Sequence, residues 1–134
     1  MKIVCDTNIL ISGILFGGKP REILHLCSSG SVVNTISPDI LKEVEEVLIR
    51  PKFGLNEKRV YEIIRLFRDT FKLVNPGERL SVVTDDPDDN RILEAALASG
   101  ADAIVSGDAH LLNLVSWNGI PVISADTFLK HGHL

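Results

Sequence analysis

Four acidic residues, Asp6, Glu43, Asp89 and Asp108, stand where a charged side chain is costly. Asp6 and Asp108 each follow an apolar run that is typical of a buried strand, and Asp89 lies at the start of an expected helix. Carboxylates beside a hydrophobic core need a positive partner. Hard divalent cations such as Mg²⁺ or Mn²⁺ prefer oxygen ligands, so these residues predict a metal site and metal-dependent chemistry on phosphates.

Asp6 and Asp108 are each open to two interpretations. Aspartate favours helix N-caps, so each residue could simply cap the helix that follows it. The string Cys-Asp-Thr-Asn at a buried strand end favours a functional role for Asp6, with Asn8 holding the neighbouring carboxylate or a water on the metal. Ser106, close to Asp108, could place its hydroxyl on a ligand or on Asp108 itself.

The acidic stretch Asp85–Asn90 contains several candidates with different expected roles. Asp86 precedes a proline, so we expect it to cap the helix that begins there. Asp88 and Asp89 then occupy the first turn, where negative charge suits the helix dipole. At roughly 100° per residue, Asp89 points the same way as the apolar residues of this helix, whereas Asp88 is turned toward its flank. We therefore predict Asp89 as a ligand and Asp86 as a supporting residue that acts through water.

Glu43 lies in a helix whose spacing of apolar residues defines one buried face. It borders one edge of that face, Glu45 borders the other edge, and Glu46 points to solvent. Helix geometry alone does not separate Glu43 from Glu45. For an arbitrary helix, an ordinary solvated side chain would be the favoured interpretation of either residue.

Strands alternate with helices along the chain. Apolar, β-branched runs predict strands at Lys2–Cys5, Val32–Ile36, Ala103–Ser106 and Ile120–Ser124, with weaker signals at Leu73–Val74 and Leu80–Val83. Helices are expected at Thr7–Leu15, Arg21–Ser28, Pro38–Arg50, Glu57–Phe71, Pro87–Ser99, Ala109–Val115 and Ala125–Lys130. This alternation predicts one α/β domain, residues 1–134, with a largely parallel sheet. Because ligands bind at the carboxyl ends of such strands, Asp6 and Asp108 should share one rim.

The bulk composition bounds the class of protein. The chain has 134 residues, of which 45% are hydrophobic, enough for one domain with its own core. No apolar run approaches the roughly 20 residues of a membrane span, and the first residues lack the pattern of a signal peptide. We therefore expect a cytoplasmic protein outside the membrane, in which Cys5 and Cys27 are small core residues rather than a disulfide.

The formal net charge of −4 at first argues against a nucleic-acid binder, which usually carries a basic surface. Without the four acidic candidates, however, the rest of the chain has no net charge. Cations bound by these side chains would therefore remove the repulsion of a phosphate backbone. The acidity does not exclude nucleic acid, but it disfavours binding without metal.

Four segments, in this order, closely resemble the motifs of PIN-domain ribonucleases. They are Ile3–Ser12, Ser37–Phe53, Asp86–Asn90 with the alanine-rich helix after it, and Val105–Asp108 with Leu111-Leu112. The resemblance covers nearly the whole chain and places the acidic residues of the family on Asp6, Glu43, Asp89 and Asp108. It thereby favours Glu43 over Glu45.

The resemblance is strongest to the PIN group of toxin components of bacterial and archaeal toxin–antitoxin systems. It implies a single Rossmann-like PIN domain, with a parallel sheet of about five strands flanked by helices. The implied activity is that of a Mg²⁺- or Mn²⁺-dependent endoribonuclease that hydrolyses single-stranded RNA. The implied partners are a protein antitoxin and further copies of the chain, in a homodimer or higher homo-oligomer.

The expected mechanism is metal-assisted hydrolysis of a phosphodiester. Asp6, Asp89 and Asp108 would ligate one or two ions, with Glu43 ligating an ion or ordering a water, and the cation would make that water a better nucleophile. Contacts with the RNA backbone could come from Arg50, Lys52, Arg59, Arg65 and Arg68. The chain has few aromatic residues, which argues against an extended base-stacking platform.

Two other classes of function remain open from the sequence. A phosphatase of the haloacid dehalogenase type also begins with a strand-end aspartate, but it normally needs a second aspartate two residues on, where this chain has Asn8. A non-catalytic RNA-binding or regulatory domain would need none of the carboxylates for its function.

Overall fold

A short buried strand, β1, lies in the interior of the sheet, and the rest of the chain is built around it. The computed structural model describes residues 1–83 and 86–132. The strands are β1 (Lys2–Cys5), β2 (Val33–Ile36), β3 (Lys72–Leu73), β4 (Ala103–Val105), β5 (Ser116–Trp117) and β6 (Ile120–Ile123). Ile3 pairs with Asn34 of β2 on one side and with Ala103 of β4 on the other, in parallel in both cases.

The strand order, β3-β2-β1-β4-β6-β5, reverses direction next to β1. The chain builds outward from β1 to β3, then returns to place β4 against the free side of β1. Strands β1, β2, β3, β4 and β6 are parallel, which confirms the expected sheet, and β5 is an additional antiparallel strand. Asn118 and Gly119, both at positive φ, form the two-residue turn between β5 and β6.

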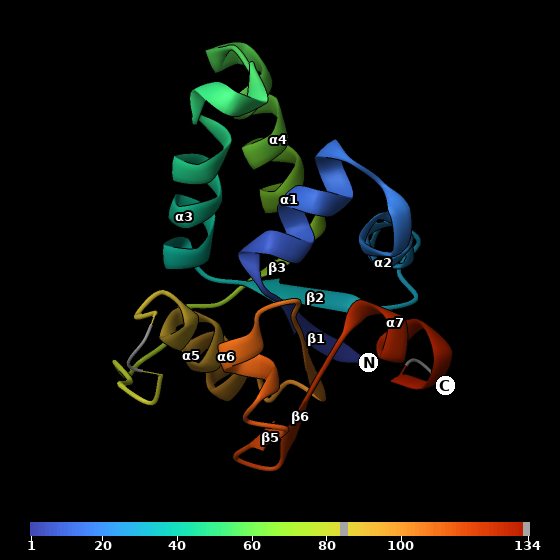
Figure 1. Cartoon of the computed structure of the whole chain (residues 1–134), viewed down its shortest axis with the longest axis vertical. Coiled ribbons are helices and arrows are strands. Elements are labelled where there is room, and N and C mark those ends of the chain that lie inside the picture. The colour runs from blue at the N-terminus through green and yellow to red at the C-terminus, as the bar shows by residue number, and fades with distance from the viewer. Residues whose placement is uncertain (84–85, 133–134) are drawn as a thin grey trace.

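Helices cover the sheet on both sides (Figure 1), with α1 to α4 on one side and α5 and α6 on the other. They are α1 (Thr7–Leu15), α2 (Gly18–Ser28), α3 (Pro38–Leu48), α4 (Glu57–Thr70), α5 (Asp89–Ser99), α6 (Ala109–Leu112) and α7 (Ala125–Thr127). Serine and asparagine caps begin α3 and α4 as expected: Ser37 accepts from the Ile40 N–H, and Asn56 accepts from the Arg59 N–H. A single-turn helix, Pro51–Phe53, links α3 to α4, and a wider turn, Phe128–Gly132, follows α7.

The core lies where β1 and β4 pack between the two layers of helices. Ile3, Val4 and Ile104 are fully buried there. Cys5 and Cys27 are also buried and carry free thiols, as predicted. Among the described residues, none of the helices has the length and apolar character that crossing a bilayer would require.

Several expected boundaries are wrong for identifiable reasons. Residues 80–83 do not form a strand, because their backbone groups bind side chains of α5 instead of another strand. Helix α5 begins at Asp89 rather than Pro87, and α2 begins at Gly18, with Pro20 inside its first turn. Helix α6 ends at Leu112, three residues before Val115, which lies at positive φ. Asp85 lies outside the described residues.

Candidate metal centre

Asp6 occupies the point at which the strand order reverses. It follows β1 directly, and its backbone N–H donates to the Val105 carbonyl of β4 at 3.0 Å. Its carboxylate is 4% exposed and accepts hydrogen bonds from the N–H groups of Ile9, at 2.9 Å, and Gly107, at 3.2 Å. Asp6 therefore caps α1 and also joins the ends of β1 and β4. In open α/β sheets, ligands bind at this kind of position.

Ser106 links Asp6 to Asp108. Its hydroxyl donates to the Asp6 carboxylate and accepts from the Asp108 N–H at 2.9 Å. The Asp108 carboxylate in turn accepts from the N–H groups of His110, at 2.7 Å, and Leu111, at 3.3 Å. The capping interpretation is thus correct for both aspartates, but it leaves carboxylate lone pairs of each available to a ligand.

Asp89 and Asp86 converge on Asp108. Each of the three carboxylates offers an oxygen, and these oxygens lie within 4.8 Å of one another. Asp89 is 8% exposed, and its Oδ2 is buried without a hydrogen-bond partner among the described residues. A buried, unpaired carboxylate oxygen beside two others is unfavourable in the protein alone and suits a hard divalent cation. The donor set therefore fits Mg²⁺ or Mn²⁺.

Glu43 reaches this region from α3. Its carboxylate accepts from the Thr7 hydroxyl at 2.9 Å, and Thr7 is the residue after Asp6. Glu43 is partly buried, whereas Glu45 and Glu46 are exposed. Glu43 is not one of the three clustered carboxylates, but the charges of Asp88, Asp86 and Asp6 are close enough to act on it. The structure thus separates Glu43 from Glu45 by position, while its catalytic role remains a prediction.

Three carboxylates in this region, those of Asp89, Asp6 and Glu43, have raised pKa values. Burial, above all, and then the charges of Asp108, Asp86 and Asp6 raise the pKa of Asp89 to about 7. Burial also raises the pKa of Asp6, against the lowering effect of its hydrogen bonds. The pKa of Glu43 is raised by burial, which outweighs the hydrogen bond from Thr7. All these shifts have the same direction, as expected when like charges gather without a cation.

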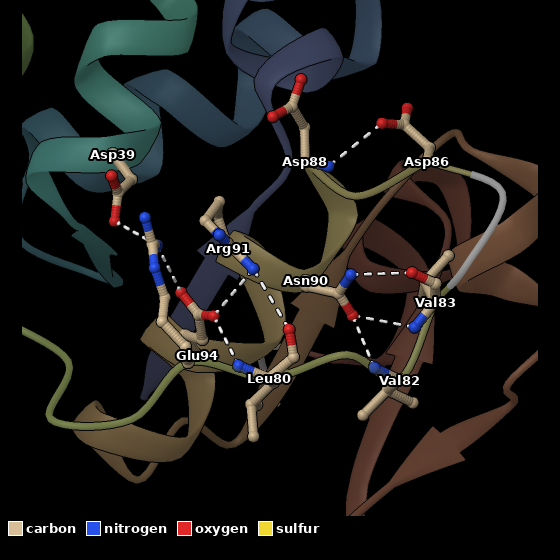
Figure 2. A network of polar contacts seen from close by, with 10 residues as sticks. Asp39, Leu80, Val82, Val83, Asp86, Asp88, Asn90, Arg91 and Glu94 are labelled. Atoms are coloured by element: carbon tan, nitrogen blue, oxygen red, sulfur yellow. Dashed lines mark hydrogen bonds and ion pairs between the residues drawn. The ribbon is translucent and has the colours of Figure 1, made fainter.

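Side chains of α5 hold the segment that leads to Asp86 (Figure 2). Asn90, which is 3% exposed, accepts from the N–H groups of Val82 and Val83, both at 2.8 Å, and donates to the Val83 carbonyl at 2.7 Å. One turn further on, the buried Glu94 accepts from the Leu80 N–H at 2.8 Å. These bonds replace the strand pairing that the sequence suggested for this segment.

Two arginines complete this network around Glu94 (Figure 2). Arg91 and Arg79 lie 3.0 and 3.3 Å from the Glu94 carboxylate, and Arg79 also contacts Asp39 of α3. Arg91 donates to the Leu80 carbonyl at 3.1 Å as well. The negative charge of Glu94 is therefore paired, in contrast to that of Asp89.

The supporting residues expected from the sequence have different outcomes. Asp86 lies within the carboxylate cluster, so it could bind a cation directly rather than through water as expected. Its carboxylate also accepts from the Asp88 N–H at 3.1 Å. Ser106 contacts Asp6 as well as Asp108. Asn8, in contrast, is exposed and makes no hydrogen bond to a carboxylate among the described residues.

The sequence analysis did not identify three residues that hold the site in position, which are Thr7, Asn90 and Glu94. The available signals were weak. Thr7 directly follows Asp6, and Asn90 and Glu94 are polar residues four positions apart beside the buried face of α5.

These features define an α/β domain with a candidate metal centre at the reversal of its strand order. A family model described as the PIN domain matches residues 2–110, which is most of the chain. The chain therefore belongs to the PIN domain family, whose members are nucleases. This family membership sets aside the phosphatase of the haloacid dehalogenase type.

Individual proteins are also similar to this chain. The uncharacterized protein MJ1680 of Methanocaldococcus jannaschii is 36% identical over 118 residues, which cover 85% of this chain and 75% of that protein. The crystal structure of VapBC2 from Rickettsia felis, bound to a DNA fragment from its promoter, contains a chain with the same fold. The TM-score is 0.65 at 13% sequence identity, over 92% of this chain and 98% of that chain.

The raised pKa of Asp89 predicts how stability depends on pH without metal. Between its usual value of 3.8 and about 7, the folded state binds more protons than the unfolded state, so stability falls as pH rises through this range. In EDTA, we expect the free energy of unfolding from urea titrations to be about 1–4 kcal/mol higher at pH 5 than at pH 8 through this residue. The same titrations with Asp89→Asn isolate the contribution, because the variant should lack it. An equal pH dependence in both proteins would contradict the prediction.

The contacts of Asn90 predict that its side chain holds segment 80–83 in place. Asn90→Ala leaves the buried Val83 backbone groups and the Val82 N–H without partners, so we expect a loss of about 2–5 kcal/mol in unfolding free energy. Hydrogen exchange at the Val82 and Val83 amides should accelerate more than exchange within α5. Asn113→Ala, at an exposed asparagine, is the control and should change neither quantity.

Proposed function

We propose that this chain is a Mg²⁺- or Mn²⁺-dependent endoribonuclease that hydrolyses phosphodiester bonds of single-stranded RNA. The observation that carries the proposal is the buried, unpaired Oδ2 of Asp89 within the cluster of Asp86, Asp89 and Asp108. A carboxylate held in this way, at a raised pKa, is costly to the fold and becomes favourable when a cation binds. The nuclease activity of the PIN domain family supports the same chemistry.

In this proposal, Asp6, Asp89 and Asp108 hold the cation, with Asp86 and Glu43 beside them. The cation, when bound, supplies Lewis-acid stabilisation of charge on the phosphate and activation of a water. The Ser106 hydroxyl and the Gly107 N–H fix the orientation of the Asp6 carboxylate. The Thr7 hydroxyl orients Glu43, so that its other carboxylate oxygen can position a water or accept a proton.

The chain's own contribution to catalysis is mainly preorganisation. Asp6 and Asp108 are held by backbone N–H groups at the N-termini of α1 and α6, and these bonds do not depend on mobile side chains. Asp89 begins α5, Asp86 lies in the turn just before it, where its carbonyl accepts from the Asp89 N–H, and Asn90 holds the preceding residues Val82 and Val83. Carboxylates from separate elements are thereby held close to one another, and those of Asp86, Asp89 and Asp108 already form a cluster that a cation can bind.

We further propose that the chain is the toxin of a toxin–antitoxin pair, located in the cytoplasm. The sequence resemblance to toxin PIN domains supports this role, and so does the shared fold with a chain of VapBC2. The expected partners are a protein antitoxin and further copies of the chain, in a homodimer or higher homo-oligomer. Growth arrest on expression of the wild type, but not of Asp89→Asn, is the expected result for a toxin. Light scattering of the purified protein tests the oligomeric state.

Asp89→Asn tests the nuclease proposal directly. With a pool of single-stranded RNAs and Mn²⁺, we expect cleavage by the wild type and a loss of about 100-fold or more in the variant, because a ligand is removed. The metal-free variant should melt at the same temperature or higher, since an unpaired buried charge is lost. Its melting temperature should respond less to Mn²⁺ than that of the wild type.

Asp69→Asn is the matched control, because Asp69 is an exposed aspartate of α4 that pairs only with the exposed Arg65 among the described residues. It should retain wild-type cleavage and the wild-type response to Mn²⁺. Full cleavage by Asp89→Asn would contradict the proposal. A wild type that neither cleaves RNA nor shifts its melting temperature with millimolar Mg²⁺ or Mn²⁺ would favour a non-catalytic domain.

A further inference from the structure

A groove of about 680 Å³ runs between α1 and the end of α3, outside the carboxylate cluster. Asn8 lines it near the start of α1, and Phe16 lines it just beyond the end of α1. On the opposite side, the lining residues are Arg50, Lys52 and Phe53, from the turn that follows α3. None of these side chains belongs to the metal centre described above.

The groove begins next to the candidate metal centre. Asn8 lies two residues after Asp6 on α1, and Val47, which also lines the groove, lies one helical turn after Glu43 on α3. At 1.5 Å per residue, the distance along α1 from Asn8 to Phe16 is roughly 12 Å. A strand with one phosphate at the carboxylates could therefore continue directly into the groove.

The charge of the groove differs from that of the chain as a whole. The net charge of the chain is −4, but no acidic side chain lines the groove, and Arg50 and Lys52 are both exposed. Among the described residues, neither cation has a carboxylate within ion-pair distance. Two unneutralised cations beside a cation-binding cluster are complementary to consecutive phosphate groups.

The groove also presents aromatic rings to solvent. Phe16 is 71% exposed, and its ring centroid lies 6.2 Å from that of Phe53. Lys52 Nζ stands 5.1 Å from the centroid of the Phe53 ring. Single-stranded nucleic acids are bound by this combination of aromatic rings, on which bases stack, and cations along the backbone. The pair is a local stacking site rather than the extended platform that the composition argues against.

We propose that the groove binds single-stranded RNA on one side of the scissile phosphate, with a base stacked on Phe16 and phosphates on Arg50 and Lys52. This inference rests on the proposed nuclease function and adds the site that holds the substrate. An acidic peptide could pair with the same two cations, so it is the competing occupant that the experiment must distinguish. The rings favour RNA, because every base offers a flat face to stack on them.

Fluorescence anisotropy with a labelled single-stranded RNA of about 12 nucleotides tests the groove separately from catalysis. Ca²⁺ replaces Mg²⁺, so that a hard cation still neutralises the carboxylates, and the RNA is checked for integrity after each measurement. Phe16→Ala should weaken binding about 5- to 150-fold, and Phe16→Trp should restore it, because stacking needs a ring. Phe16 is exposed, and unchanged melting temperatures would verify that both variants fold.

The double variant Arg50→Gln/Lys52→Gln tests the phosphate contacts. We expect weaker binding and a slope of log affinity against log salt that is about 1.4 smaller in magnitude, from about 0.7 for each lost contact with a single strand. The matched controls are Lys58→Gln/Lys72→Gln, which removes the same charge from exposed positions of α4 and β3, and Tyr61→Ala, which removes an exposed ring. Both should bind RNA as the wild type does.

The outcomes separate failure of the groove from failure of the nuclease proposal. Groove variants that bind like the wild type, or controls that lose as much affinity, would overturn the groove while wild-type cleavage with Mn²⁺ upheld the nuclease. A wild type that neither binds nor cleaves RNA would overturn both. A poly-glutamate peptide that binds more tightly than RNA, and only when Arg50 and Lys52 are present, would assign the groove to an acidic peptide instead.

Discussion

Negative charge buried at the ends of β1 and β4 is the constraint to which the surrounding structure responds. Each buried carboxylate is costly unless hydrogen bonds or an opposite charge offset the loss of water. The Asp6 carboxylate accepts from two backbone N–H groups and the Ser106 hydroxyl, and that of Asp108 accepts from two N–H groups of α6. Asp89 has an oxygen with no partner among the described residues. Hydrogen-bond donors thus surround the carboxylates of Asp6 and Asp108 but leave an oxygen of Asp89 without one. A cation would therefore stabilise the fold most at Asp89.

The main features of this arrangement could be predicted from the sequence because they follow from periodicity and topology. Apolar runs located the strands, and the rule that ligands bind where strand order reverses brought Asp6 and Asp108 to one rim. The approach of Asp86 could not be predicted in the same way. Asp86 is held by hydrogen bonds from the Asp88 and Asp89 N–H groups, and residues 82–83 are held by the side chain of Asn90, and such contacts leave no periodic pattern. The same contacts explain why a β-branched segment that resembles a strand is not one.

The start of α1 shows that neighbours of a motif in the sequence can face different surroundings. Asn8, expected to hold the neighbouring carboxylate or a water on the metal, is exposed and makes no hydrogen bond to a carboxylate among the described residues. Thr7 lies beside the site instead, and its hydroxyl donates a hydrogen bond to the Glu43 carboxylate across the interface between α1 and α3. Geometry within α3 alone left Glu43 and Glu45 equivalent. The family motif favours Glu43, and the packing of the two helices gives Glu43 this contact with Thr7. Residues that neighbour a motif in sequence therefore gain their positions from tertiary contacts.

The packing of α1 against α3 also connects the candidate metal centre to the groove. Asp6 caps the N-terminus of α1, Glu43 lies midway along α3, and most groove-lining residues follow them in the sequence. The acidic residues of the site are therefore separated from Arg50 and Lys52, which lie beyond the C-terminal end of α3. The net charge of −4 does not reveal this separation, because it is a total over the whole chain. That total includes both the acidic cluster, which suits cations, and the groove, which suits phosphates. Since two packed helices set the spacing between these regions, a strand that followed the groove would place a defined phosphate at the carboxylates.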